Sequence, residues 1–228
     1  MDGRIEQGFR HRFAALLAGE PAAARASEVG RLIAEGRRRA ASADGDVVRA
    51  LVHVYEEVRG RVAPPAEAAR AAPPRLLCDA SLGGLARWLR AAGYEAGLAP
   101  EVPPKRLPEE ARRRGAVLVT TDAEALDRRI VADGSLRVVW LPTSLLVEEK
   151  LVLVLRDLAL PLGEPRCMAC GGPLQRRAKE AVLPRIPPRT ARWKEEYFVC
   201  SACDRLYWQG THWERIAATL RHAASDAA

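Results

Sequence analysis

Two aspartates follow short apolar runs in the middle of the chain. Asp79 follows the run at 75–78, and Asp122 comes shortly after the run at 116–120. If both runs are neighbouring strands of a parallel sheet, both carboxylates project into the crevice beyond the carboxyl ends of the strands. Hard cations prefer oxygen ligands, and such an ion can polarise a phosphodiester and activate a water. The two aspartates therefore predict a magnesium or manganese site.

Each aspartate could instead cap the helix that follows it, which is the usual role of a lone aspartate at such a junction. Thr121 and Glu124 fit a capping box, which would place Asp122 inside the first helical turn. Ser81 could cap the other helix and leave Asp79 at the strand tip. We therefore favour a metal role for both aspartates, with Glu124 as a second-rank candidate.

Four of the five cysteines form two C-x-x-C pairs, Cys167 with Cys170 and Cys200 with Cys203. Each pair can form a rubredoxin-like knuckle, and four thiolates together make a tetrahedral zinc site. A redox C-x-x-C is the alternative, but two pairs that flank a hairpin argue against it. Because four thiolates close the coordination shell, the zinc is expected to be structural.

The segment around these cysteines is strongly basic. Residues 166–194 hold eight lysines and arginines and one acidic residue, in a chain of net charge +7. Basic groups bind phosphates and exposed aromatic rings stack on unpaired bases, so Trp193, Tyr197 and Phe198 could help to bind single-stranded nucleic acid. Alternatively, these rings form the small core of the ribbon and the arginines only solvate it. The candidate nucleic-acid contacts are Arg87, Arg176, Arg177, Lys179, Arg185, Arg189 and Arg192.

The elements that must position these residues follow from the hydrophobic pattern. Apolar runs at 75–79, 116–120 and 137–140 alternate with helical stretches, among them 123–134 and a last one from about 144 to 158. This alternation predicts a parallel sheet covered on both faces by helices. Residues 73–162 contain no histidine, no Gly-x-Gly-x-x-Gly and no phosphate loop, which argues against a Ser-His-Asp hydrolase or a nucleotide-binding fold.

Composition divides the chain into four expected parts. They are a helical domain at 1–60, an Ala- and Pro-rich linker at 61–74, an α/β domain at 75–162, and a zinc ribbon with a C-terminal helix at 163–228. Apolar residues at helical spacing predict three helices in the first part. The run at 37–39, three arginines, is more typical of a solvated face than of an RNA site.

The same composition argues against several classes of protein. No apolar run reaches the roughly 18 residues of a membrane span, and the first residues lack an apolar signal core. Paired cysteines in a long chain favour metal binding in a reducing compartment over a disulfide scaffold. We therefore expect a cytoplasmic protein without membrane contact.

The motifs together resemble the Mut-seven C-terminal family. The similar stretches cover roughly residues 75–222 and are LLCDASLGGLARWLRAAGYE, AVLVTTDAEAL, CMACGG and YFVCSACDRLYWQGTHWERI. The resemblance implies a PIN-like ribonuclease domain that binds Mg²⁺ or Mn²⁺, followed by a zinc ribbon. It also implies that Asp79 is the family's first acidic residue and that Asp122 is the aspartate of the family's strand-end Thr-x-Asp motif. Residues 85–90 match the family's signature helix.

The chain departs from the family pattern at two positions. Glu95 stands where the family usually has aspartate, which keeps the charge and makes Glu95 the expected third catalytic acid. The family also tends to have an acidic residue at the start of the helix before the third motif, and the equivalent position here is about Pro104. Glu101, Glu109 and Glu110 are nearby, but none of them aligns with that position. The N-terminal 70 residues also do not resemble the ubiquitin-like domain of some relatives.

We therefore expect an α/β protein with a PIN-like parallel sheet flanked by helices, an N-terminal helical segment and a C-terminal zinc ribbon. Its expected function is metal-dependent RNA hydrolysis by Asp79, Asp122 and Glu95, with the basic ribbon gripping an RNA that has a single-stranded portion. The main alternative is an RNA-binding adaptor that has lost catalysis, suggested by Pro104. A third is a toxin-like nuclease whose N-terminal helical domain docks a protein partner.

Overall fold

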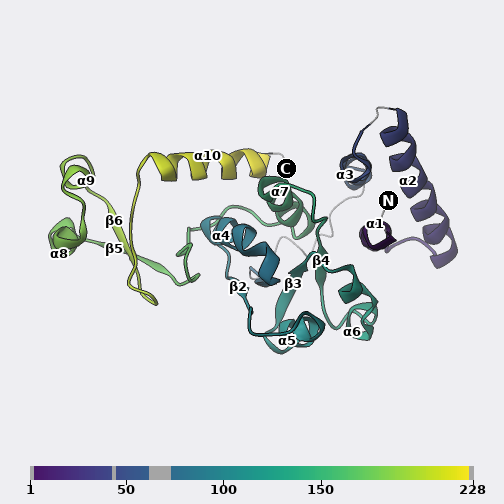
Figure 1. The fold of residues 1–228 in the computed structure, drawn as a ribbon, viewed down its shortest axis with the longest axis horizontal. Helices are drawn as coiled ribbons and strands as arrows, with labels where there is room; N and C mark the ends of the chain where they lie inside the picture. Colours follow the sequence, from purple (N-terminus) through teal and green to yellow (C-terminus); the bar gives the residue numbers. More distant parts are fainter. Residues whose placement is uncertain (1–2, 43–44, 62–72, 226–228) are drawn as a thin grey trace. The chain divides into compact units, whose positions relative to one another are not determined.

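The computed structural model describes residues 3–42, 45–61 and 73–225 (Figure 1). The chain forms two compact units, one from Met1–Ala71 and Val102–Leu146 and the other from Ala72–Glu101 and Val147–Ala228. The predicted linker at 61–74 lies mostly outside the described residues.

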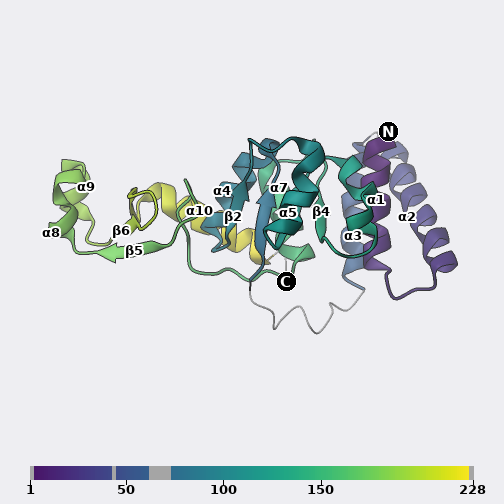
Figure 2. The same ribbon diagram turned by 90° about the horizontal axis from the view of Figure 1, so that it is seen from below.

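Three helices form the N-terminal part of the first unit: α1 (Gly3–Leu16), α2 (Ala22–Ser42) and α3 (Val47–Arg59). They pack on one another, as Figure 2 shows. Their apolar faces are buried as the helical spacing predicts, with Phe13 and Leu51 fully enclosed. Asp46 caps α3, because its side chain accepts a hydrogen bond from the Val48 amide at 2.8 Å. The predicted N-terminal helical segment is confirmed.

The rest of the first unit contains one pair of parallel strands. β3 (Ala116–Thr120) and β4 (Val138–Trp140) pair in the register Leu118 to Val138, and every residue of β3 is buried. Near-continuous burial is typical of strands that are covered on both faces. The other elements of this part are η2 (Pro104–Arg106), α5 (Leu107–Arg113), η3 (Ala123–Asp127) and α6 (Arg129–Ala132).

The second unit holds the other parallel pair, β1 (Arg75–Cys78) and β2 (Ala96–Leu98). Between them run η1 (Ala80–Leu82) and α4 (Gly83–Ala91), and α4 packs against α7 (Val147–Asp157). The strand order of the four-stranded sheet is β2-β1-β3-β4. The predicted class, a parallel α/β sheet flanked by helices, is confirmed.

The C-terminal part of the second unit is a small antiparallel sheet in the order β5-β6-β7. Its strands are β5 (Leu174–Arg177), β6 (Tyr197–Cys200) and β7 (Leu206–Trp208). Three short helices connect β5 to β6: α8 (Lys179–Val182), η4 (Leu183–Arg185) and α9 (Pro188–Trp193). Figures 1 and 2 show α8 and α9 together at one end of the β5–β6 pair. The last helix, α10 (Thr211–Ser225), packs on α7.

Two elements differ from the sequence-based prediction. β2 was not predicted, and the helix expected at 123–134 is instead η3 followed by the four-residue α6. The break falls at Arg128, whose backbone is extended, with φ −69° and ψ 137°. No helix of the described residues is long and apolar enough to cross a membrane.

Candidate functional site

The four paired cysteines converge on one point. Their sulfur atoms all lie within 4.8 Å of one another, with 3.6 Å between the Sγ atoms of Cys167 and Cys203 and 3.4 Å between those of Cys170 and Cys200. Four sulfurs at about 2.3 Å from a tetrahedral zinc lie about 3.8 Å apart. The donor set therefore fits a zinc ion, and four thiolates leave no position for a substrate.

The two cysteine pairs form equivalent turns. Gly171 and Asp204, which follow the second cysteine of each pair, have positive φ angles of 82° and 57°. The Gly171 amide donates to the carbonyl of Cys167 at 2.7 Å, and the Asp204 amide donates to that of Cys200 at 2.9 Å. The left-handed backbone explains why glycine suits this position and why an aspartate is tolerated there.

The first of these turns is fixed to the α/β part of the same unit by Arg90. This side chain is 6% exposed; its Nε donates to the carbonyl of Ala96 in β2 at 2.7 Å. Its Nη1 donates to the carbonyls of Met168 and Ala169 between the cysteines, at 3.0 and 2.8 Å. Arg90 can be buried because its planar guanidinium group donates to carbonyls of β2 and of the cysteine turn at once.

Asp79 lies directly after β1 in the second unit and is half-buried. Its Oδ1 accepts hydrogen bonds from the Ser81 amide at 2.9 Å and the Ser81 hydroxyl at 2.5 Å, so it is the N-cap of η1. Asp122 lies after β3 in the first unit, is also half-buried, and accepts from the Glu124 amide at 2.9 Å as the N-cap of η3.

Both aspartates therefore cap a helical turn, and the prediction that Ser81 and Thr121 would do so is wrong. The cap uses Oδ1 in both side chains. A carboxylate offers about four lone-pair sites on two oxygens, so an N-cap aspartate can still ligate a cation. Carboxylate oxygens are the type of ligand that Mg²⁺ and Mn²⁺ prefer.

Glu95 lies at the opposite end of its strand pair from Asp79. The register pairs Cys78 with Leu98, so Asp79 is level with Ala99, while Glu95 precedes β2. Four residues along a strand correspond to about 13 Å. Glu95 is exposed and forms an ion pair with Arg75 at 3.3 Å. The expectation that Glu95 completes the site of Asp79 is therefore corrected: the acid lies at the amino end of β2.

Lys150 is a neighbour of Asp79 that the sequence did not indicate. It stands in the first turn of α7, where burial lowers its pKa and the charges of Asp79 and Glu149 act in the opposite direction. A lysine at a helix start is too common for sequence alone to single it out. The Cys78 thiol, at the end of β1, is fully buried, and this burial raises its pKa to about 12.

Within the part of the chain that the structure describes, some of the basic side chains predicted to bind RNA form ion pairs with acidic residues, and others do not. Arg176 pairs with Glu196 at 2.7 Å, and Lys179 pairs with Glu195 at 2.6 Å. Arg185 pairs with Asp204 at 3.2 Å. The remaining candidates are all exposed and have no ion pair among the described residues: Arg87, Arg177, Arg189 and Arg192.

The aromatic residues of the C-terminal part also differ, because one is buried and another is exposed. Tyr197 is fully enclosed in a small core with Val182, Ile186 and Val199. Trp193, at the end of α9, is 82% exposed. The two interpretations left open by the sequence thus apply to different residues: Tyr197 is a core residue and Trp193 is a surface residue.

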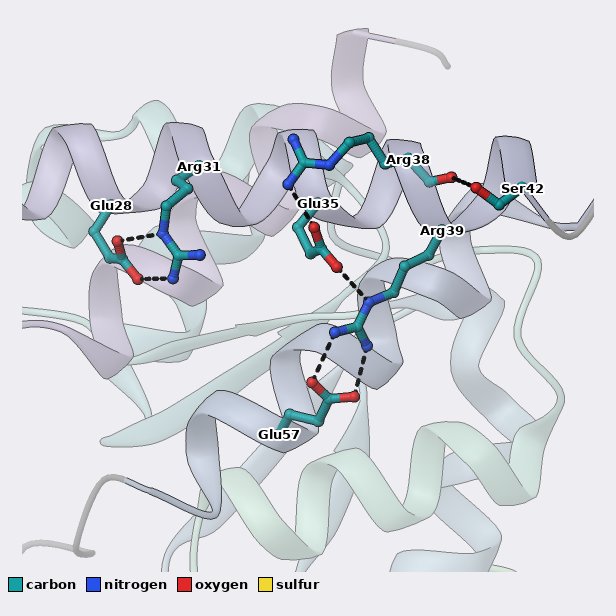
Figure 3. Close-up of polar contacts among 7 residues, drawn as sticks. All are labelled: Glu28, Arg31, Glu35, Arg38, Arg39, Ser42 and Glu57. Atoms are coloured by element: carbon teal, nitrogen blue, oxygen red, sulfur yellow. Dashed lines mark hydrogen bonds and ion pairs between the residues drawn. The ribbon is translucent and has the colours of Figure 1, made fainter.

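The arginine run at 37–39 is a paired surface. Arg38 and Arg39 bind Glu35, and Arg39 also binds Glu57 of α3 through two hydrogen bonds of 2.6 and 3.0 Å (Figure 3). Arg37 pairs with Glu6. Because acidic partners neutralise the run, the prediction of a solvated face is confirmed.

Comparison with known proteins gives one match. The family model of the Mut7-C RNAse domain matches residues 74–220, which span both strand-end aspartates and all four paired cysteines. Neither the curated proteins nor the solved structures gave a match. The matched region is more than half of the 228 residues and indicates a ribonuclease-type function. The chain belongs to the Mut7-C RNAse domain family.

Proposed function

We propose that this protein is a cytoplasmic ribonuclease that cleaves RNA phosphodiester bonds with one or two divalent ions, for which Asp79 and Asp122 are the proposed ligands. The observation that carries the proposal is that each aspartate lies within two residues of the carboxyl end of a parallel strand, inside the region matched by the RNase family. A bound Mg²⁺ or Mn²⁺ would supply charge stabilisation and an acidified water. Reduced, zinc-binding cysteines favour the cytoplasm.

The chain's own residues would orient the ion and the substrate. The caps at Ser81 and Glu124 fix the rotation of the two carboxylates, because each holds one oxygen against a backbone amide. Lys150 places a cationic group near Asp79, where it can bind a phosphate oxygen of the RNA. Glu95 has no part in this arrangement.

The first experiment measures cleavage of a labelled RNA in Mn²⁺ by the wild type and by Asp79→Asn and Asp122→Asn. Each substitution keeps a side chain that can cap but removes the charge, so we expect at least a hundredfold loss of rate, which corresponds to about 2.7 kcal/mol in the barrier. Glu95→Gln is the matched control and should cleave at the wild-type rate. Wild-type rates in both aspartate variants would refute the proposed site.

The main RNA-binding surface is proposed to lie on α9. Arg189, Arg192 and Trp193 are spaced i, i+3 and i+4, so they share one face of this helix. The two guanidinium groups are available for phosphates, and the exposed indole offers a stacking surface for an unpaired base. The other ribbon candidates can contribute, but Arg176, Lys179 and Arg185 must first leave their acidic partners.

The role of this surface is tested by measuring, with fluorescence anisotropy, the affinity for a single-stranded oligoribonucleotide without divalent ions. Loss of one stacked base costs roughly 1–3 kcal/mol, so Trp193→Ala should weaken binding by a factor of about 5 to 150. Leu183→Ala, which truncates another exposed apolar residue on the same connection, is the control. Equal affinities for these two variants would exclude stacking on Trp193.

A second candidate function is an RNA-binding adaptor without catalysis. It is favoured by the position of Glu95 away from Asp79 and by Pro104, which begins η2 where the family tends to have an acid. Such a protein would bind the oligoribonucleotide through α9 and show no cleavage in Mg²⁺ or Mn²⁺. Metal-dependent cleavage that Asp79→Asn abolishes would eliminate this candidate.

A further inference from the structure

Helix α1 packs on η3, the turn that Asp122 caps, and it also packs on Trp140 at the end of β4. A Cβ atom added to Gly8 of α1 would lie 2.4 Å from atoms of the Trp140 indole, so only glycine allows this approach. The ring of Phe9 meets the same indole edge-on, with 5.5 Å between centroids. Nη1 of the buried Arg12 donates to the Trp140 carbonyl at 2.7 Å. Trp140 is thus contacted by three residues of α1.

Trp140 in turn holds the residue before Asp122. Its indole Nε1 donates to the carbonyl of Thr121 at 3.2 Å. The next amide along the chain, that of Asp122, donates to the Thr120 hydroxyl at 3.0 Å. The backbone that leads from β3 to Asp122 is therefore fixed through an indole that packs on α1.

A second set of contacts joins α1 directly to residues of η3. Arg4 of α1 pairs with Glu124 at 3.1 Å, and the Gln7 amide donates to Oδ2 of Asp127 at 2.6 Å. These two acids belong to η3, which begins directly after Asp122. The turn is thus tethered near its beginning and at its last residue.

The hydrogen bonds at the two ends of the turn are long. The amides of Ala125 and Arg128 donate to the carbonyls of Asp122 and Ala125, both at 3.4 Å, whereas 2.9–3.0 Å is usual. A short 3₁₀ turn with long hydrogen bonds has little stability of its own. Its conformation therefore depends on the elements packed against it, which are α1, α6 and β4.

We infer that the N-terminal helical domain is a positioning element of the nuclease site, which holds the Asp122 carboxylate in place through Trp140 and η3. Arg12 also lies 4.3 Å above the ring of Tyr55, so α1 is tied to α3 and the three helices act as one body. The inference rests on the proposed role of Asp122. It gives residues 1–60 a function within the chain itself.

The test is Trp140→Phe in the full-length zinc-loaded protein, because phenylalanine keeps a ring against α1 but cannot donate to Thr121. Hydrogen exchange of the amides of 121–127, without divalent ions, should accelerate roughly two- to tenfold, the value of one lost hydrogen bond. The Mn²⁺ concentration for half-maximal cleavage should rise by a similar factor, while oligoribonucleotide affinity stays unchanged. Glu57→Gln, which removes an ion pair between α2 and α3, is the control and should change neither quantity.

The possible results separate the inference from the proposed function. Unchanged exchange at 121–127 in Trp140→Phe would overturn the inference, even if Asp122→Asn is inactive. Faster exchange with a fully active Asp122→Asn would support the structural tether and refute the proposed function. If Trp140→Phe does not fold, Gln7→Ala removes the tether to Asp127 alone, and the same exchange measurement decides.

Discussion

Single residues in this protein serve the fold and the candidate site at the same time. Asp79 and Asp122 each cap a helical turn with Oδ1 and stand at a strand end where a cation could bind. Sequence located both aspartates but assigned the caps to their neighbours. A hydroxyl and a carboxylate two residues apart can both cap the same turn, and only the backbone geometry decides between them.

The cysteines and Arg90 show the two extremes of what could be predicted. The spacing of the cysteines predicted the four-cysteine cluster, which could hold a zinc ion, because two C-x-x-C turns leave few other arrangements. The burial of Arg90 could not be predicted, because it depends on carbonyls of Met168 and Ala169, far away in sequence.

Replacement of Arg90 by lysine should destabilise the protein. Lysine cannot reach three carbonyls in two directions, so buried acceptors lose partners, at a cost of about 2 kcal/mol or more. Thermal unfolding of the zinc-loaded protein measures this, with Arg87→Lys on the exposed face of α4 as the control. Equal melting temperatures of the two variants would contradict the role assigned to Arg90.

At the scale of elements, the sequence predicted the strands that have a strong apolar signal and missed the weak one. β3 and β4 are rich in valine and were predicted nearly to the residue. β2 consists of Ala96-Gly97-Leu98, which lacks β-branched residues, and is a strand because it pairs with β1. The helix expected at 123–134 failed because Asp122 caps a 3₁₀ turn that ends at an extended Arg128.

The contact of α1 with η3 contains a histidine with a lowered pKa. Burial of His11 lowers its pKa below the ordinary value of 6.5, Arg12 adds to the shift, and Asp127 of η3 opposes it. The unfolded chain therefore binds a proton at a higher pH than the folded chain does. The stability that neutral His11 provides is complete above about pH 6.5 and is lost as the pH falls through the folded-state pKa.

We predict that acid weakens the docking of α1 and that His11→Gln reduces this effect. The melting temperature of the wild type should fall more than that of the variant between pH 7.5 and pH 5. Carboxylates titrate in both proteins, so the difference between the two curves isolates His11. Parallel curves over this range would show that His11 does not couple pH to stability.

At the scale of the whole molecule, the family and the fold class followed from motif order, and the function of the N-terminal domain did not. Alternating strands and helices, two strand-end acids and two cysteine pairs together specify a Mut7-C RNAse domain with a zinc ribbon. The role of residues 1–60 depends on contacts such as that of Gly8 with Trp140, which no local pattern reveals. Long-range packing against a single indole leaves no periodic signal in sequence.

The most direct test of the account is Mn²⁺ binding to the zinc-loaded protein, measured by electron paramagnetic resonance of the free ion. If Asp79 and Asp122 are ligands of the catalytic metal, either Asp→Asn substitution alone should weaken Mn²⁺ binding at least tenfold, and Glu95→Gln should not. Wild-type Mn²⁺ affinity in both aspartate variants would contradict metal binding by these residues and, with it, the proposed hydrolytic site.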